Sequence, residues 1–258
     1  MKGFCPLASG SKGNCLYIGT ENTKLLIDAG LSAKMIVDKL SQIDVSIDEI
    51  DAVLITHEHI DHIRGLGVLC SKFNLPVFAN SETAKVILSQ SNHPLKFKIF
   101  STGESFVYGD IEIHPFSIQH DAVDPVAFTF SFAGMKIGVC ADLGFPSTLV
   151  ESQLRECDYL YIEANHQPEM VHASARPMVY KQRVLGRQGH LSNESCAQLI
   201  RSVLHKNLKY IYLAHLSSEC NAPELALNII RKMLQSCGSD IDVSVANQDT
   251  ISHPLKFI

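Results

Sequence analysis

Residues 56–62 read Thr-His-Glu-His-Ile-Asp-His, which places three histidines and Asp61 within six residues. In an extended backbone, side chains two residues apart point the same way, so His57 and His59 can hold one metal ion as a pair. Asp61 and His62 lie further along the turn, where a second metal could bind. Imidazole suits zinc and iron, and carboxylate extends the choice towards harder ions such as manganese. The pattern predicts a metal site, and the alternative is a histidine-rich surface turn.

One metal needs about four ligands, so two metals need more ligands than this segment supplies. Further aspartates and histidines follow other apolar runs, and these residues are Asp28, His120, Asp142 and His215. The run before His57, residues 52–55, has the pattern of a buried strand. Sheets of α/β proteins place their chemistry at the carboxyl ends of strands. Each residue alone is more typical of a helix cap, a turn or a surface position. Together they predict one metal centre assembled at strand ends.

This order of motifs resembles the metallo-β-lactamase superfamily over nearly the whole chain. The resemblance implies an α/β chain with the metallo-β-lactamase fold, a four-layer αβ/βα sandwich, and two divalent metal ions, zinc or manganese, with iron also fitting. It implies that the first metal is bound by His57, His59 and His120. The second would be bound by Asp61, His62 and His215, and Asp142 would bridge both. Asp28 would hydrogen-bond a ligand and fix its orientation.

Further blocks narrow the resemblance within the superfamily. Glu163-Ala164-Asn165, Gly189-His190-Leu191-Ser192 and Ala214-His215-Leu216-Ser217 resemble blocks of the tRNA-processing nuclease RNase Z. The stretches at 9–14 (Ser-Gly-Ser-Lys-Gly-Asn) and 120–125 (His-Asp-Ala-Val-Asp-Pro) are closer still to the small bacterial YycJ/WalJ branch. That branch implies a single-domain 5′-to-3′ DNA exonuclease linked to DNA repair, with a nucleic acid, DNA, as its partner.

The same resemblance assigns roles near the metals. Asp61, His190 and Glu163 are the expected catalytic residues, with His190 beside the scissile phosphate and oriented by Glu163. A histidine placed there can donate a proton to the leaving alkoxide. The alternative is that His190 caps a helix that begins near Asn193. Residues expected to bind phosphate or substrate are Ser11, Lys12, Asn14, Arg183, Arg187, Ser192, Ser217 and Asn221.

Hydrophobic periodicity predicts the elements that position these residues. Strands are expected at 2–7, 14–19, 24–28, 52–55, 76–79, 105–108, 111–118, 126–132, 135–141, 159–163, 210–214 and 241–245. Helices are expected at 32–40 with Ser32 as N-cap, 63–73, 81–89, 193–205 and 223–235. The order gives two β-rich halves, each flanked by helices, without a sequence repeat or linker.

Length and composition fit a single metallo-β-lactamase domain at 1–258, since the chain is 46% hydrophobic and can bury a full core. No apolar run approaches the roughly 20 residues that span a bilayer, so no membrane partner is expected. The eight cysteines lack regular spacing, and Cys70, Cys140 and Cys196 have apolar neighbours. This pattern favours buried thiols in a reducing cytoplasm.

The formal net charge of −5 is mildly unfavourable for binding nucleic acid, but its distribution matters more than its sum. No acidic residue lies between Glu169 and Glu194, a window that contains Arg176, Lys181, Arg183 and Arg187. This basic window is either an ordinary solvated face or a rim that contacts phosphates.

These observations predict a phosphodiesterase in which a hydroxide shared by two metals attacks phosphorus. No serine or cysteine motif indicates a protein nucleophile. The alternatives are another hydrolase of the same fold, namely an RNA-processing nuclease, a cyclic phosphodiesterase, a β-lactamase or a glyoxalase II-like thioesterase. A flavodiiron-type redox protein is disfavoured because the chain has no room for a flavodoxin domain. A metal-free scaffold is disfavoured because every ligand position is filled.

Overall fold

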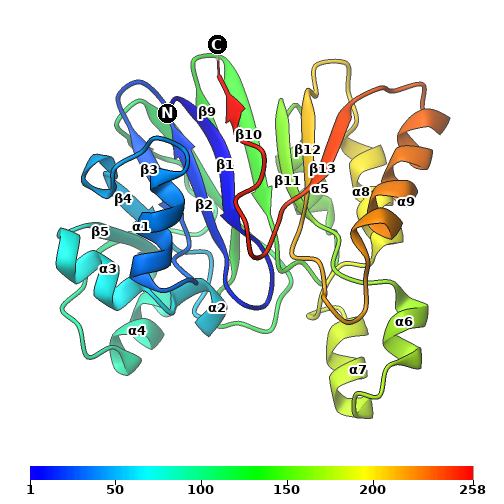
Figure 1. Cartoon of the computed structure of the whole chain (residues 1–258), viewed down its shortest axis with the longest axis horizontal. Helices are drawn as coiled ribbons and strands as arrows, with labels where there is room; N and C mark the ends of the chain where they lie inside the picture. The colour runs from blue at the N-terminus through cyan, green and yellow to red at the C-terminus, as the bar shows by residue number, and fades with distance from the viewer. Residues whose placement is uncertain (258) are drawn as a thin grey trace. The chain divides into compact units, whose positions relative to one another are not determined.

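Two mixed seven-stranded sheets organise residues 1–257, the part of the chain that this computed structural model describes (Figure 1). The first sheet has the order β14-β1-β2-β3-β4-β5-β6, and the second has the order β13-β12-β11-β10-β9-β8-β7. The strands of the first sheet are β1 (Gly3–Ala8), β2 (Cys15–Gly19), β3 (Lys24–Ile27), β4 (Ala52–Leu54), β5 (Pro76–Asn80), β6 (Lys96–Phe100) and β14 (Leu255–Lys256). Those of the second are β7 (Phe106–Tyr108), β8 (Ile111–Ser117), β9 (Val126–Phe132), β10 (Met135–Cys140), β11 (Tyr159–Glu163), β12 (Tyr210–Ala214) and β13 (Asp242–Val245).

The chain divides into two compact units. Unit 1 comprises residues 1–112, 122–126 and the segment from Ala246 onwards, and unit 2 comprises residues 113–121 and 127–245. Each unit has its own hydrophobic core, which corresponds to one of the two β-rich halves expected from the sequence. The assignment of residues 1–258 to a single metallo-β-lactamase domain stays a prediction.

Unit 1 changes from antiparallel to parallel pairing at β3. The pairs β1–β2 and β2–β3 are antiparallel, whereas β3–β4, β4–β5 and β5–β6 are parallel. Its helices are α1 (Ala33–Ser41), the 3₁₀ turn η1 (Ile47–Glu49), α2 (Ile60–Ile63), α3 (Leu66–Phe73) and α4 (Ser81–Gln90). Leu26, Val53 and Val77 of the sheet are fully buried together with Ile36 of α1 and Leu69 of α3. Parallel pairing brings the carboxyl ends of β3 and β4 to one edge, where Asp28 and His57 follow.

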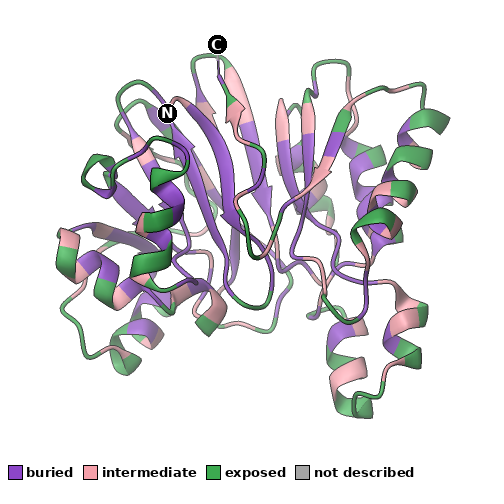
Figure 2. Cartoon of the chain, in the orientation of Figure 1, coloured by how far each residue is buried: buried purple, intermediate pink, exposed green. Residues whose placement is uncertain are grey.

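In unit 2, β9 and β10 pair antiparallel, and β10-β11-β12-β13 form a parallel series. Its helices are α5 (Thr148–Leu154), α6 (Pro168–Ala173), α7 (Met178–Leu185), α8 (Asn193–Val203) and α9 (Pro223–Ser236). Helices α5, α8 and α9 cover the sheet with their apolar faces, while α6 and α7 extend beyond its edge (Figure 1). The burial colouring shows buried strands and helices buried on one side (Figure 2). Parallel β10, β11 and β12 end together, so Asp142, Glu163 and His215 share one edge.

The structure departs from the sequence predictions in a few places. The expected helix at 63–73 is wrong as a single element, because α2 and α3 are separate and meet at Gly65. A side chain at Gly65 would collide with the carbonyl oxygen of Leu31, so glycine is required for this close approach. Strands β6 and β14 and helices α5, α6 and α7 were not predicted. Ser32 caps α1 as expected, since its side chain accepts a hydrogen bond from the backbone of Met35.

Candidate metal centre

The first group of candidate ligands lies in unit 1 on the loop after β4 and on α2. His57 is buried, and its ring centroid lies 4.7 Å from that of His59 and 4.1 Å from that of His62. An Oδ2 of Asp61 lies 3.7 Å from Nε2 of His62. Four side chains with nitrogen or oxygen ligand atoms therefore gather on this segment, as the spacing of the motif predicted.

Asp28 fixes which ring nitrogen of His62 carries a proton. Asp28 follows β3 with a positive φ of 62°, a conformation that is uncommon for residues other than glycine. Its Oδ2 lies 2.7 Å from Nδ1 of His62, and Thr56 donates its backbone N–H and its hydroxyl to the same carboxylate. A carboxylate only accepts, so Nδ1 of His62 carries the proton. The lone pair of His62 is then on Nε2, the atom available to a metal.

The chain after β3 and the loop at 10–14 hold the metal loop in place. The backbone N–H of Asn14 donates to the carbonyl of Asp61 at 2.8 Å, and that of Ala29 donates to the carbonyl of His62 at 2.7 Å. A side chain at Gly30 would overlap the carbonyl oxygen of Asp61, so only glycine permits this approach. Gly30 therefore allows the backbone of the metal loop to pack closely against this part of the chain.

The second group of candidate ligands lies in unit 2 at the ends of β10, β11 and β12. Asp142, Glu163, His190 and His215 each offer a ligand atom, and these atoms all lie within 4.8 Å of one another. Asp142 and His215 are buried and have positive φ values of 54° and 53°. Backbone in this region is strained for non-glycine residues, and such strain gathers at functional sites. His120, buried after β8, has its ring centroid 5.3 Å from that of His190 and its Nδ1 3.2 Å from the carbonyl oxygen of Gly189.

Glu163 organises this second group. It is fully buried, and its Oε1 lies 2.8 Å from Nδ1 of His190 and 3.1 Å from Nδ1 of His215. Its Oε2 accepts the backbone N–H groups of Leu143 at 2.7 Å and Leu191 at 3.2 Å. Burial raises the pKa of Glu163, but the charge of His190 and the hydrogen bonds from His190 and His215 outweigh burial and leave the pKa below its ordinary value. Glu163 is therefore an ionised acceptor that places protons on both Nδ1 atoms and leaves both Nε2 atoms for other partners.

The donor set fits zinc or manganese. Imidazole nitrogens and carboxylate oxygens are ligands for both ions, and iron would also fit. A carboxylate fixes the tautomer of His62 in one unit and of His215 in the other, as is usual for histidines that bind metal. Unit 1 presents four candidate ligand side chains, and unit 2 presents five when His120 is counted with Asp142, Glu163, His190 and His215.

Several residues expected to bind phosphate have structural contacts. Ser192 is the N-cap of α8, which contradicts the alternative that His190 caps this helix. Ser217 accepts hydrogen bonds from the backbone of Cys220 at 3.0 Å, so it stabilises a turn. Asn221 is buried and donates to the carbonyl of Ala164 at 2.8 Å. A phosphate-binding role for these residues stays a prediction.

The other expected phosphate ligands differ in exposure. Asn14 is buried, and its amide nitrogen lies 3.0 Å from Nε2 of His62. Ser11 and Lys12 are exposed, and Lys12 lies 3.6 Å from a carboxylate oxygen of Asp249. Arg183 and Arg187 are exposed in unit 2. Arg183 forms an ion pair with Asp121 at 2.5 Å, so this guanidinium is already engaged by the chain.

Sequence reasoning gave no role to three residues that contact or adjoin the candidate ligands. Thr56 lies 3.0 Å from Nδ1 of His57 through its hydroxyl, and Asn165 donates to the carbonyl of His215 at 2.7 Å. His166 is buried, and desolvation lowers its pKa to about 4. Their positions carried a usable signal, because each adjoins a motif that was recognised.

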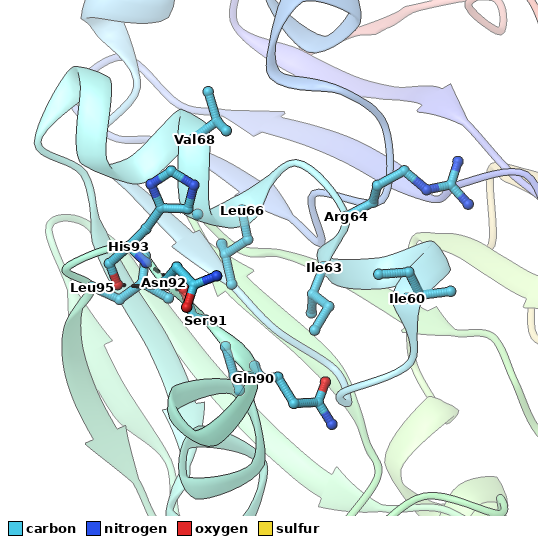
Figure 3. Close-up of a pocket in the computed structure, with 12 residues that line it drawn as sticks. Ile60, Ile63, Arg64, Leu66, Val68, Gln90, Ser91, Asn92, His93 and Leu95 are labelled. Atoms are coloured by element: carbon cyan, nitrogen blue, oxygen red, sulfur yellow. Dashed lines mark hydrogen bonds between the residues drawn. The ribbon is translucent and has the colours of Figure 1, made fainter.

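The metal loop also borders a small apolar hollow. The hollow has a volume of about 240 Å³ and lies among α2, α3 and the end of α4 (Figure 3). Ile60, between two candidate ligands in the chain, lines it together with Leu66, and Gln90 and Asn92 provide polar atoms at its edge. Ile60 is also one of the exposed apolar side chains of the chain, with 63% of its surface accessible.

The cysteines of the chain are mostly buried thiols. All eight are free thiols, and all except Cys237 are buried, including Cys70, Cys140 and Cys196 as predicted. Burial raises the pKa of the Cys140 and Cys196 thiols, so neither is a reactive thiolate. Over residues 1–257, none of the helices has both the length and the apolar character needed to cross a bilayer.

Comparison with known proteins places these clusters in a family. A model described as a β-lactamase superfamily domain matches residues 23–213. The chain belongs to the metallo-β-lactamase superfamily. Within this superfamily it is 38% identical over 249 residues to exodeoxyribonuclease YycJ of Bacillus anthracis, covering 96% of this chain and 94% of that protein. It is also 38% identical over 266 residues to exodeoxyribonuclease WalJ of Streptococcus pneumoniae, covering 98% and 96% of the two chains.

A solved structure shows the same fold. The metallo-β-lactamase fold protein YhfI of Bacillus subtilis superposes with a TM-score of 0.73 at 15% identity, covering 96% of this chain and 97% of that one. The α/β class and the metallo-β-lactamase fold expected from the sequence are thereby confirmed. Histidine and aspartate clusters on this fold, together with the YycJ and WalJ relatives, identify a metal-dependent hydrolase.

Proposed function

We propose that this metallo-β-lactamase superfamily member is a dinuclear phosphodiesterase that removes nucleotides from the 5′ ends of DNA. In this proposal the two ligand groups form one centre. The first metal would be bound by His57, His59 and His120, and the second by Asp61, His62 and His215, and Asp142 would be a ligand of both. The order of these residues along the chain matches the motif order of the superfamily. Similarity over nearly the whole length to two exodeoxyribonucleases supports DNA as the substrate.

The observation that carries the proposal is the setting of His190. This histidine is outside the expected ligand set, yet its Nδ1 lies 2.8 Å from Glu163 and 3.5 Å from Oδ1 of Asp142. Its side chain is 18% exposed, so substrate can reach it, whereas Glu163 is fully buried. A phosphodiester has a poor leaving group, an alkoxide, which benefits from a proton donor. A thioester has a better leaving group, a thiolate, and so has less need of a proton donor.

The residues of the chain have distinct tasks in this mechanism. Divalent ions bound at such a centre lower the pKa of water and neutralise charge on phosphoryl oxygens. Asp28 and Glu163 keep His62 and His215 in the tautomer with the lone pair on Nε2. Asp61 acts from the start of α2 as a ligand and as an acceptor for the proton of the attacking water. His190, held at Nδ1 by Glu163, donates the proton on Nε2 to the departing 3′ oxygen.

The proposal is tested with a substrate panel on metal-loaded protein: 5′-phosphorylated single-stranded and duplex DNA, RNA of the same sequence, a thioester and a cephalosporin. We expect DNA to be degraded to mononucleotides from its 5′ end, with turnover that falls as salt rises because phosphate contacts release counterions. Preferential cleavage of RNA would identify an RNA-processing nuclease. Turnover of the thioester or the cephalosporin with intact nucleic acid would reject the phosphodiesterase.

A further inference from the structure

The aromatic ring of Phe145 and the guanidinium of Arg187 lie together in unit 2. Phe145 is three residues after Asp142 in the chain, and Arg187 is forty-five residues after it. The guanidinium carbon of Arg187 lies 4.0 Å from the centroid of the Phe145 ring. Phe145 is 37% exposed, and Arg187 is exposed. Among residues 1–257, the side chain of Arg187 shows no hydrogen bond or ion pair, so its N–H groups remain available to a ligand.

The backbone fixes this pair beside the unit 2 ligands. Gly144 donates its N–H to the carbonyl of Gln119 at 2.8 Å, which ties the loop after β10 to the residue before His120. A side chain at Gly144 would collide with the carbonyl oxygen of Arg187 and with the backbone of Gly189. The two loops are therefore in contact through their backbones. In the chain, Phe145 is close to Asp142 and Arg187 is close to His190, and the hydrogen bond from Gly144 to Gln119 links the Phe145 loop to the segment that carries His120.

The segment that contains Arg187 borders a hollow with room for a nucleotide. It has a volume of about 470 Å³, and its lining includes Asp121, Arg183, Arg187 and Gln188. Arg183 is held by Asp121, so the two arginines differ: one guanidinium is fixed at the wall and the other stacks on an aromatic ring. A cation for phosphate and a ring for a base are the two features by which proteins bind single-stranded nucleic acid.

We propose that Phe145 and Arg187 form a stacking site for one unpaired nucleobase of the substrate strand, with the adjoining phosphate in the hollow beside Arg187. This inference rests on the proposed nuclease function and adds the state of the substrate: the strand is unpaired where it leaves the metal centre. A base within a duplex has both faces covered by its neighbours, so it stacks on Phe145 only after the end has frayed. The site therefore favours single-stranded ends over blunt duplex ends.

Binding of a phosphorothioate oligonucleotide tests the site without turnover. A 5′-phosphorylated, 3′-fluorescein single strand is titrated with metal-loaded protein, and anisotropy gives Kd. Stacking of one base on an aromatic ring is worth about 1–3 kcal/mol, so Phe145→Ala should weaken binding roughly 5-fold to 150-fold. Phe145→Trp should retain wild-type affinity within about 3-fold. Arg187→Ala should also weaken binding, and Arg201→Ala, which removes an exposed arginine in the last turn of α8, is its matched control for loss of charge.

A scan of abasic nucleotides identifies the base that stacks. In wild-type protein, one position near the 5′ end should lose affinity when its base is removed. At that position Phe145→Ala should cause no further loss, because both changes remove the same contact. Losses that add at every position, or a Phe145→Ala protein with wild-type affinity, would overturn the proposal. If Phe145→Ala fails to fold, Phe145→Leu gives the same test, since leucine keeps an apolar side chain beneath Arg187 without a ring.

Hydrolysis of a small phosphodiester separates this inference from the proposed function. Phe145→Ala should hydrolyse an abasic dinucleotide at the wild-type rate within about 2-fold, because this substrate has no aromatic ring to stack. A loss on the small substrate equal to that on DNA would show that Phe145 is structural and would overturn the site. Wild-type protein that shows the abasic pattern but cleaves no phosphodiester would keep the stacking site and reject the nuclease.

Discussion

Replacing Glu163 by glutamine tests the organisation of the unit 2 ligands in detail. The carboxylate receives four N–H groups, two from Leu143 and Leu191 and two from His190 and His215. A glutamine amide has one oxygen and one NH₂ group, so it can accept only half of them. If NH₂ faces the histidines, both must present a lone pair at Nδ1, and the proton moves to Nε2, where His215 then no longer binds metal. If NH₂ faces the backbone, two buried donors lose their acceptor.

Either arrangement has a measurable consequence. Two lost bonds to a buried charged acceptor correspond to about 3–5 kcal/mol of folding free energy. Altering the partner of a ligand histidine typically weakens metal binding 10-fold to 100-fold. Urea unfolding in EDTA gives the first quantity, and competition with a chromophoric zinc chelator gives the second. Glu112→Gln, at an exposed position of β8, is the control. A Glu163→Gln protein within about 1 kcal/mol of wild type and with unchanged zinc affinity would refute this account of Glu163.

Three further outcomes are expected. His190→Ala should keep the wild-type metal content and lower kcat on DNA roughly 10²-fold to 10⁴-fold; loss of metal would make His190 a ligand, and normal turnover would make it structural. His166 has a pKa of about 4 in the folded chain, below the usual value near 6.5, so its contribution to stability is complete above about pH 6.5 and is lost as pH falls towards 4. Between pH 7 and pH 5 the unfolding free energy of wild type should therefore fall by about 2 kcal/mol more than that of His166→Gln, and equal slopes in urea titrations would contradict the assignment. Gly30→Ala should displace the backbone of Asp61, lower stability by roughly 1–3 kcal/mol and weaken metal binding, whereas unchanged zinc affinity would show that the contact is dispensable.

The sequence was informative where chemistry follows a buried strand. Asp28, Asp142 and His215 each come directly after or within two residues of an apolar strand, and an apolar run indicates where such a strand ends. Parallel pairing then brings those ends together, which is why candidate ligands could be named from types and spacing. The sequence could not predict that His62 is the partner of Asp28, because this contact spans 34 positions and depends on a positive φ at Asp28.

Elements without a clear apolar period were missed. Helices α6 and α7 lie in the basic window, and each buries little: Val171 is the buried residue of α6 and Val184 that of α7. Because each helix has so small an apolar face, the sequence of the basic window is as typical of a solvated loop as of a helix. Strand β6 was missed because it lies at the edge of the first sheet, where Lys96, Lys98 and Ile99 are exposed and Phe100 is its buried residue. The contact between Phe145 and Arg187 was likewise missed, because it joins two loops whose sequences give no indication that they lie together.

Metal content tests the central claim, that the two ligand groups form one dinuclear centre, most directly. Protein dialysed against saturating zinc or manganese is analysed for metal per chain, alongside Asp142→Ala and the exposed-site control Asp240→Ala. We predict close to two ions per chain in wild type and in the control. Asp142→Ala should lose both ions, together with degradation of DNA, because the shared ligand is gone. At most one ion in wild-type protein under saturation, or two ions retained by Asp142→Ala, would contradict the account.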